Sequence, residues 1–168
     1  MRFLAALSLV LALSACATVE RYDAAGDIHA FMIAIRDNDR AGFDQHVDRS
    51  ALKAQMRSRL TASMIRRGGG LGGLLGQTLG GVSDALVEAA LRPQVFLAVA
   101  EAKGYRPSQP LPGRVAITGS LRQLDPDRVC VTGKKDEDCL LVFRNEGGTW
   151  RLIAFEGPLD ALKLPALG

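Results

Sequence analysis

The spacing of apolar residues changes once along the chain, and this change constrains the fold more than any other feature. In DIHAFMIAIRDND, at residues 27–39, apolar residues recur at intervals of three and four, the spacing of one buried helix face. From residue 114 onward, apolar and polar residues alternate, which is typical of half-buried β-strands. We therefore expect a helical N-terminal half and a β-sheet in the C-terminal half.

Several separate helices are expected in the first half. Asp39 should cap a short second helix and Ser50 a third, because short polar side chains accept hydrogen bonds from the first free N–H groups. Arg92-Pro93 should break the helical region, and Gly104 suits the end of the helix PQVFLAVAEAK. The residues assigned to buried helix faces are Ile28, Phe31, Met32, Ile35, Phe43, Val47, Leu52, Met56, Leu60, Met64, Leu79, Val82, Leu86 and Ala89.

Four strands are expected in the second half, joined by short connections. The candidates are RVAITGSLRQL, RVCVTG, CLLVFRN and TWRLIAFEG, separated by Asp125-Pro126-Asp127, by a charged turn, and by Glu146-Gly147-Gly148. Connections this short imply an antiparallel meander. The predicted fold class is α+β, with N-terminal helices packed on one face of a C-terminal four-stranded antiparallel sheet.

Two cysteines flank the charged turn VTGKKDED. We expect Cys130 and Cys139 to form a disulfide, with a hairpin register that places them opposite each other and Val129 opposite Leu140. A metal site is the rival interpretation, but two cysteines without a nearby histidine make a poor ligand set.

The third cysteine follows an apolar run near the N-terminus. The apolar run, Phe3 to Leu13, is too short to span a bilayer as a helix. Small residues precede Cys16, as in a secretory signal peptide. The order Leu13-Ser14-Ala15-Cys16 resembles the bacterial lipoprotein signal, in which the cysteine is acylated and becomes the new N-terminus. An ordinary secretory peptide with an incidental cysteine is the alternative. The predicted organisation is a signal peptide at 1–15, an acylated tether at 16–26 and a single α+β domain at 27–168.

The lipoprotein interpretation predicts a location. Acyl chains would hold the protein on a membrane, and Ala17 occupies the position where an aspartate often retains lipoproteins at the inner membrane. We expect an envelope protein at the outer membrane, with its domain facing the periplasm. The formal net charge of +3 is too small to indicate binding to nucleic acid.

No reactive constellation stands out in the sequence. His46, with Asp44 or Asp48, is the only local grouping of histidine and aspartate, and it is more simply explained as a solvated helix end. His29 is the other histidine, and no cysteine lies near either one, so we predict no metal, cofactor or catalytic residue. The acidic turn KKDED lacks the ligand spacing of a calcium loop and is expected to be a hairpin tip.

A glycine-rich segment separates the expected third and fourth helices. Its glycines include a G-x-G-x-x-G match, but no strand precedes it as a dinucleotide-binding fold requires. Gly68, Gly72, Gly76 and Gly80 form one stripe at helical spacing. We expect this stripe to pack within the domain or to be mobile rather than to insert into a membrane.

The order of elements resembles two known groups. The runs AIRDNDRAGFDQHVDRSALKAQMRSRL and LVEAALRPQVFLAVAEAKG are similar to the bacterial envelope proteins of the family called domain of unknown function 2939. Helices followed by a meander also resemble the cone of nuclear-transport-factor-2-like proteins, which implies a pocket between helices and a curved sheet. The expected function is non-catalytic binding of a partner protein or an apolar small molecule; the alternative is a hydrolase or isomerase with an acid or base near His46.

Overall fold

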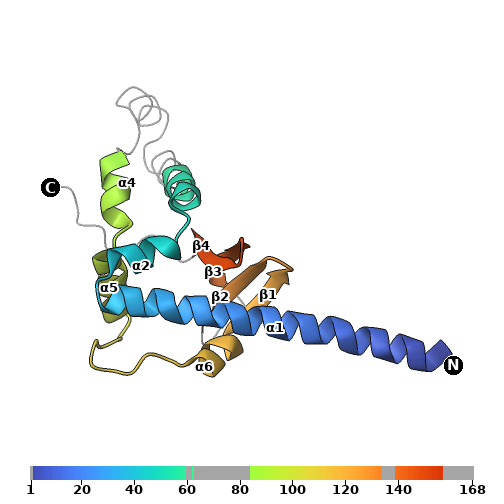
Figure 1. The fold of residues 1–168 in the computed structure, drawn as a ribbon. Coiled ribbons are helices and arrows are strands. Elements are labelled where there is room, and N and C mark those ends of the chain that lie inside the picture. Colours follow the sequence, from blue (N-terminus) through green and yellow to red (C-terminus); the bar gives the residue numbers. More distant parts are fainter. Residues whose placement is uncertain (1, 60–61, 63–83, 134–138, 157–168) are drawn as a thin grey trace.

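The computed structural model describes the backbone of residues 2–59, 62, 84–133 and 139–156, and the side chains of residues 18–59, 62, 87–133 and 139–156. In chain order, the helices are α1 (Arg2–Arg36), α2 (Arg40–Gln45), a helix over residues 49–59, α4 (Asp84–Ala90), α5 (Pro93–Ala102) and α6 (Arg114–Gly119). The strands are β1 (Leu121–Asp125), β2 (Arg128–Thr132), β3 (Cys139–Glu146) and β4 (Thr149–Phe155). The α+β class is confirmed (Figure 1).

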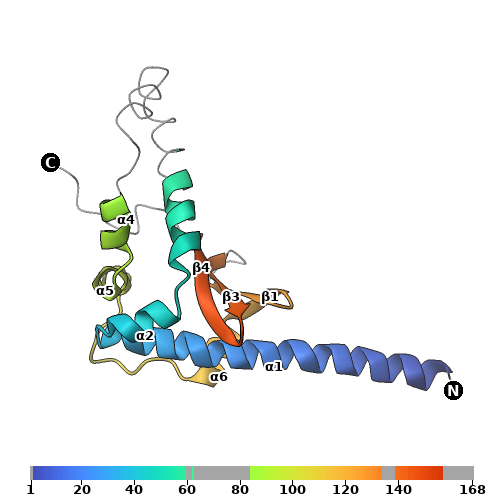
Figure 2. The ribbon, with the colours of Figure 1, turned by 45° about the horizontal axis from the view of Figure 1, so that its top comes forward.

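The four strands form one antiparallel sheet in the order β1-β2-β3-β4, the expected meander. Helix α1 contacts both edge strands, β1 and β4, so it lies across one face of the sheet (Figures 1 and 2). The side chains of Val129, Phe143 and Leu152 point to that face and are fully buried. We call this the inner face of the sheet, and the opposite one the outer face.

The helix periodicity predicted for residues 27–39 is confirmed. Ile28 and Phe31 are buried in the core, and Met32 and Ile35 pack against it. Helix α1 ends at Arg36, and Asp39 then caps α2 by accepting hydrogen bonds from two of its backbone N–H groups, as expected.

The cap of the next helix differs from the prediction. Asp48, rather than Ser50, accepts the backbone N–H of Ala51, at 3.0 Å, and also the hydroxyl of Ser50, at 2.5 Å. The carboxylate of Asp48 reaches the third N–H of this turn, which is the usual capping geometry. Ser50 therefore supports the cap rather than forming it.

Helix α4 presents a different face to the core from the one expected. Ala89 is exposed, whereas Val87 and Ala90 are buried. Glu88 forms ion pairs with Arg49 and Lys53 of the helix over 49–59, so this partly exposed side of α4 faces that helix. Leu60, Met64, Leu79 and Val82 lie outside the described residues, as does the side chain of Leu86.

The predicted helix break at Arg92-Pro93 and the predicted helix end at Gly104 are both confirmed. Arg92 has extended backbone angles and Pro93 is the first helical residue. Lys103 forms the C-cap, and Gly104 follows with a φ of +97°, a conformation that glycine adopts without steric cost.

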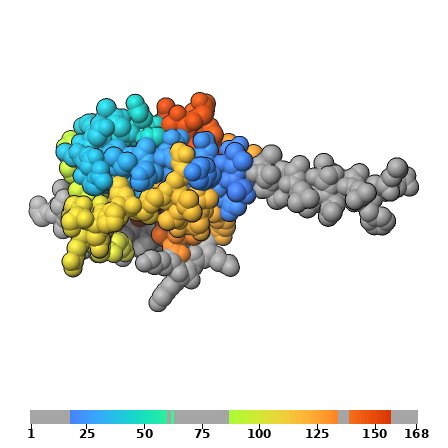
Figure 3. Space-filling model, turned by 60° about the horizontal axis from the view of Figure 1, so that its bottom comes forward, coloured from blue at the N-terminus to red at the C-terminus, as the bar shows by residue number. Residues whose placement is uncertain are grey.

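The first expected strand is wrong over residues 114–119, which form α6. The alternating apolar residues there do not alternate in burial, since Ile117 is buried and Val115 is 78% exposed. Instead the helical turn packs on α1, where the guanidinium of Arg114 lies 5.0 Å from the ring centre of Tyr22. Gly26 permits this approach, because a Cβ there would lie 1.9 Å from Arg114 Nη2. Figure 3 shows the chain before and through α6 against α1.

Residues 16–26, the expected acylated tether, lie within α1. The helix runs through this segment without interruption, and Ala24 and Ala25 are fully buried in the core. Alanine has the highest intrinsic helix propensity, which favours helix here. The division into signal peptide, tether and domain stays a prediction.

Candidate functional site

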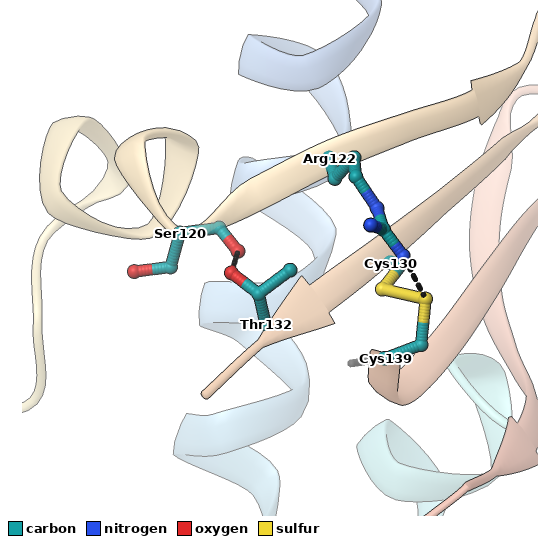
Figure 4. The surroundings of a disulfide bond; sticks show 5 residues. All are labelled: Ser120, Arg122, Cys130, Thr132 and Cys139. Atoms are coloured by element: carbon teal, nitrogen blue, oxygen red, sulfur yellow. Dashed lines mark hydrogen bonds between the residues drawn. A yellow bond between two sulfur atoms is a disulfide. The ribbon is translucent and has the colours of Figure 1, made fainter. Parts of the chain in front are cut away.

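The Cys130–Cys139 disulfide is present, with the two Cα atoms 5.4 Å apart, within the range usual for disulfides. The predicted register is wrong. Cys130 lies opposite Val142, and Cys139 lies opposite Thr132 because Leu140 is an extra, unpaired residue in β3. Figure 4 shows the two cysteines joined across the hairpin. The bond therefore crosses the hairpin diagonally.

The register is set by the core rather than by the cysteines. Val129 pairs with Phe143, and both are fully buried on the inner face. Pairing Val129 with Leu140 would require a shift of three residues, an odd number, which would move every β3 side chain to the other face. Leu140 is in fact 40% exposed.

His46 is buried, with 8% exposure, so the expected solvated helix end is wrong. The backbone carbonyl of His46 accepts the N–H of Leu152 at 2.8 Å, and Asp48 donates its N–H to the carbonyl of Leu152 at 3.0 Å. These bonds hold the turn against β4. Within the described residues, His46 Nδ1 has no hydrogen-bond partner.

Neither neighbouring carboxylate pairs with His46. Asp44 binds the guanidinium of Arg49 at 2.5 Å. Asp48 caps its helix and lies 3.3 Å from Arg144. Partial burial raises the pKa of Asp48, but hydrogen bonds from Ser50 and from backbone N–H groups, together with Arg144, outweigh it and leave that pKa lowered. The grouping suggested by the sequence is therefore not assembled as an acid–base pair.

An aromatic cluster fills the space between the helices and the sheet. Phe31 lies at its centre, with ring centres 5.4 Å from Phe43, 5.9 Å from Phe96 and 5.8 Å from Phe143. Beside the cluster, a cavity of about 30 Å³ is bounded by apolar residues that include Met56, Leu91 and Phe96. Pockets that hold drug-sized molecules have volumes of about 300–1,000 Å³. The inner cavity is far smaller than such a pocket.

The outer face carries a second, open hollow of about 500 Å³. Its lining includes Leu124, Arg128, Cys139, Val142, Ile153 and Glu156. Leu124 is 41% exposed. His46 lines neither this hollow nor the inner cavity.

Trp150 joins the sheet to α1 through two carboxylates. Its backbone N–H donates to Asp27 Oδ2 at 2.7 Å, and its indole Nε1–H donates to Asp23 Oδ2 at 3.2 Å. Asp23 and Asp27 are four residues apart and therefore share one face of the helix. The acidic spacing was visible in the sequence, but its partner lies more than a hundred residues away.

The remaining predicted residues are placed as follows. His29 donates from Nδ1 to the carbonyl of Pro112 at 3.0 Å and so links α1 to the segment before α6. Cys16 lies in α1, but its side chain is outside those described, as are the glycine stripe of residues 68–80 and the turn at 134–138. Among the described side chains, no three His, Cys, Asp or Glu gather as a metal site would require. In the same part of the chain, no helix combines the length and apolar character needed to cross a membrane.

The chain was compared with known proteins and families. No curated protein and no solved structure matches it. A family model described as "Protein of unknown function (DUF2939)" matches residues 9–99, just over half of the chain, from α1 into α5. The resemblance inferred from the helical half is thus confirmed, and the chain belongs to the family described as Protein of unknown function (DUF2939).

Proposed function

We propose that this protein is a non-catalytic lipoprotein of the bacterial envelope that binds a partner protein close to the membrane. Acyl chains on Cys16 would provide the anchor, because Leu13-Ser14-Ala15-Cys16 has the residue types and order of a lipoprotein signal at the end of an apolar run. Two or more acyl chains are enough for stable membrane attachment. With Ala17 after the cysteine, we place the anchor in the outer membrane and the domain in the periplasm.

The observation that carries this proposal is the continuity of α1. The helix leads from Cys16 directly to Ala24, a fully buried core residue. Eight residues of helix span about 12 Å, compared with about 30 Å for an extended tether of ten residues. A stiff, short connection would hold the domain against the lipid surface.

The surface near the anchored end supports the same orientation. Val19 and Tyr22 on α1 are 66% and 46% exposed, and Val115 on the adjacent α6 is 78% exposed. Arg114 stacks on the ring of Tyr22. Tyrosine and arginine side chains suit the membrane interface, because each combines an apolar body with a polar end. We propose that this end of the domain faces the lipid headgroups.

The filled interior argues against an apolar small-molecule ligand and therefore favours a protein partner. The space that a cone-like fold would offer to a ligand is occupied by the rings of Phe31, Phe43, Phe96 and Phe143. The remaining cavity, about 30 Å³, has room for only about one water molecule. The enzymatic alternative gains no support from His46, which lines neither of the two cavities.

Labelling with radioactive palmitate tests the anchor. Wild-type protein should incorporate the label and begin at Cys16 after processing, whereas Cys16→Ser should remain an unlabelled precursor. Unlabelled wild-type protein, or a mature chain that starts elsewhere, would rule out the anchor. Separation of the two envelope membranes by density should then place the wild-type protein with the outer membrane.

Vesicle flotation tests the orientation. Acylated wild-type protein and a Tyr22→Ser/Val115→Ser variant should both float, but limited protease should cut α6 of the variant faster, because the headgroups shield it less. A matched control, Leu124→Ser, alters an exposed apolar residue on the outer face of the sheet. Equal cleavage of all three proteins would contradict a lipid-facing end.

A further inference from the structure

The two sulfur atoms of the disulfide lie in different surroundings. Cys130 is fully buried within β2, with Arg122 of β1 on one side and Val142 of β3 on the other. Cys139 is partly exposed at the first residue of β3 and lines the hollow of the outer face. An external molecule can therefore reach Cys139 from the hollow, whereas the strands shield Cys130.

A cation lies beside the accessible sulfur. Arg122 Nη2 is 3.2 Å from Cys139 Sγ, and the arginine side chain reaches it from β1 across β2 (Figure 4). Arg122 is exposed and forms no ion pair among the residues that the structure describes. A guanidinium next to a sulfur favours its thiolate form, which is the nucleophile in thiol–disulfide exchange.

We propose that Cys139 is the sulfur through which this hairpin exchanges with external thiols and disulfides, that Cys130 closes the bond, and that Arg122 is a positioning residue for the exchange. This inference does not depend on the lipid anchor. It assigns unequal roles to two cysteines that a purely structural disulfide would leave equivalent.

The exchange proceeds in two balanced steps from the reduced protein. The Cys139 thiolate attacks one sulfur of an external disulfide, forms a mixed disulfide and releases one external thiolate. Cys130 then loses its proton to solvent, and its thiolate attacks Cys139 Sγ, which closes the hairpin bond and releases the second external thiolate. The protein dithiol is oxidised, and the external disulfide is reduced to two thiols. In the reverse direction, an incoming thiolate attacks the accessible Cys139, and Cys130 is the leaving group.

The charged residues that line the hollow, Arg128 and Glu156, are already paired. Arg128 binds Asp125 at 2.5 Å, and Glu156 binds Arg59 at 3.0 Å. Arg122 is thus the cation that the described structure places directly on Cys139. The hollow of about 500 Å³ is large enough to admit a small thiol or a cysteine side chain of a peptide.

Mapping of the first mixed disulfide tests the proposal. Reduced protein in a Cys16→Ser background would be mixed with bis(2-hydroxyethyl) disulfide, an uncharged probe, quenched with acid after short times and analysed by peptide mass spectrometry. We expect the earliest adduct on Cys139. An earliest adduct on Cys130, or equal labelling of both, would overturn the proposal. This measurement needs no cysteine substitution in the hairpin, so it is valid even if such variants fold poorly.

Single-cysteine variants extend the test. In the same background, Cys130→Ser should accumulate a stable adduct on Cys139, whereas Cys139→Ser should react slowly while folded and quickly in urea. Rapid reaction of folded Cys139→Ser, with an unchanged circular dichroism spectrum, would mean that burial does not protect Cys130.

The role of Arg122 has its own readout. A guanidinium beside a thiol raises its thiolate fraction at neutral pH, and the lower nucleophilicity of that thiolate offsets only part of the gain, which leaves a rate effect of about threefold. In the Cys130→Ser background, Arg122→Gln should lower the rate at pH 7 by about threefold and move the pH profile upward. Arg122→Lys should restore part of both effects, and Arg106→Gln, a change at an exposed arginine after α5, should have neither. Identical profiles for Arg122→Gln and the parent would remove Arg122 from the proposal.

Discussion

The two faces of the sheet are stabilised in different ways. On the inner face, Val129, Phe143 and Leu152 are fully buried beneath the helices, and the phenylalanine rings of four elements meet there. The outer face carries the disulfide, Arg122 and an open hollow. Packing therefore stabilises the inner face and a covalent bond the outer face. The two contributions to stability can be measured separately.

The largest effect is expected from Phe143→Ala on the inner face. The substitution removes a fully buried ring that lies 5.8 Å from that of Phe31, and changes of this kind cost about 3–5 kcal/mol of stability. Urea unfolding, followed by the fluorescence of Trp150, measures the loss. Leu140→Ala on the outer side is the control, with an expected cost below about 1 kcal/mol because the side chain is already 40% exposed. Equal losses of stability in the two variants would contradict the idea that packing stabilises mainly the inner face.

Reduction of the disulfide should have the next largest effect. The bond closes a short loop, since the cysteines are nine residues apart, and it should contribute about 2–3 kcal/mol by restricting the unfolded chain. Unfolding with and without reductant measures this contribution. The double variant Cys130→Ala/Cys139→Ala should be insensitive to reductant, and a reductant effect that persists in it would have another source.

The attachment of the inner face to α1 is tested by Asp27→Ala. This change leaves the backbone N–H of Trp150 without its acceptor and should cost about 1–3 kcal/mol. Asp27→Asn keeps an acceptor oxygen at the same position and should cost less. Equal stability of Asp27→Ala and the wild type would show that this bond does not hold the helix on the sheet.

The smallest effect is expected from a partly exposed ion-pair group between two helices, where Glu88 of α4 binds Lys53 and Arg49. The hydrogen bond from Lys53 is the main cause that lowers the pKa of Glu88 below its ordinary value of 4.5, with the charges of Lys53 and Arg49 adding to it. A carboxyl group with a lowered folded-state pKa stabilises the fold above its unfolded pKa and loses that contribution as pH falls through the folded value.

Glu88→Gln should therefore destabilise the protein at pH 7 by at most about 1 kcal/mol, the range for partly exposed ion pairs. The difference from wild type should shrink as pH falls below about 4.5 and should also shrink at high salt. Unfolding curves from pH 7 to pH 3 measure it. A difference that grows toward low pH would contradict the assigned pairing.

Much of the helical layer over the inner face could be predicted from the sequence, because its sequence signals are local and repeated. The spacing of Ile28, Phe31 and Ile35 indicates a helix face without knowledge of its neighbours. Asp39 and Pro93 mark helix boundaries through backbone geometry that operates within one turn. Three of the four strands were correctly located by alternation and by their short connections.

The outer face was harder to predict, because its features depend on strand register. The cysteine pair predicted the disulfide correctly but predicted the wrong register, since a bridge across a hairpin tolerates a diagonal geometry when one strand is irregular. Arg122 was missed because it lies in a separate strand, and its contact with Cys139 depends on the pairing of β1 with β2. The same dependence on distant partners explains why residues 114–119 form a helix on α1 despite their alternating pattern.

By itself, the sequence determined the α+β class, the succession of a helical half and a four-stranded meander, the disulfide pair and the lipoprotein-like signal that motivates the proposed anchor. Only the tertiary structure decided which β3 residues face the core, how closely the first helix joins Cys16 to the domain, and which sulfur is accessible. Periodicity and capping act over a few residues, whereas register, burial and solvent access are set by the packing of segments far apart in the chain. The exposure of Cys139 and its contact with Arg122 are features that tertiary packing sets.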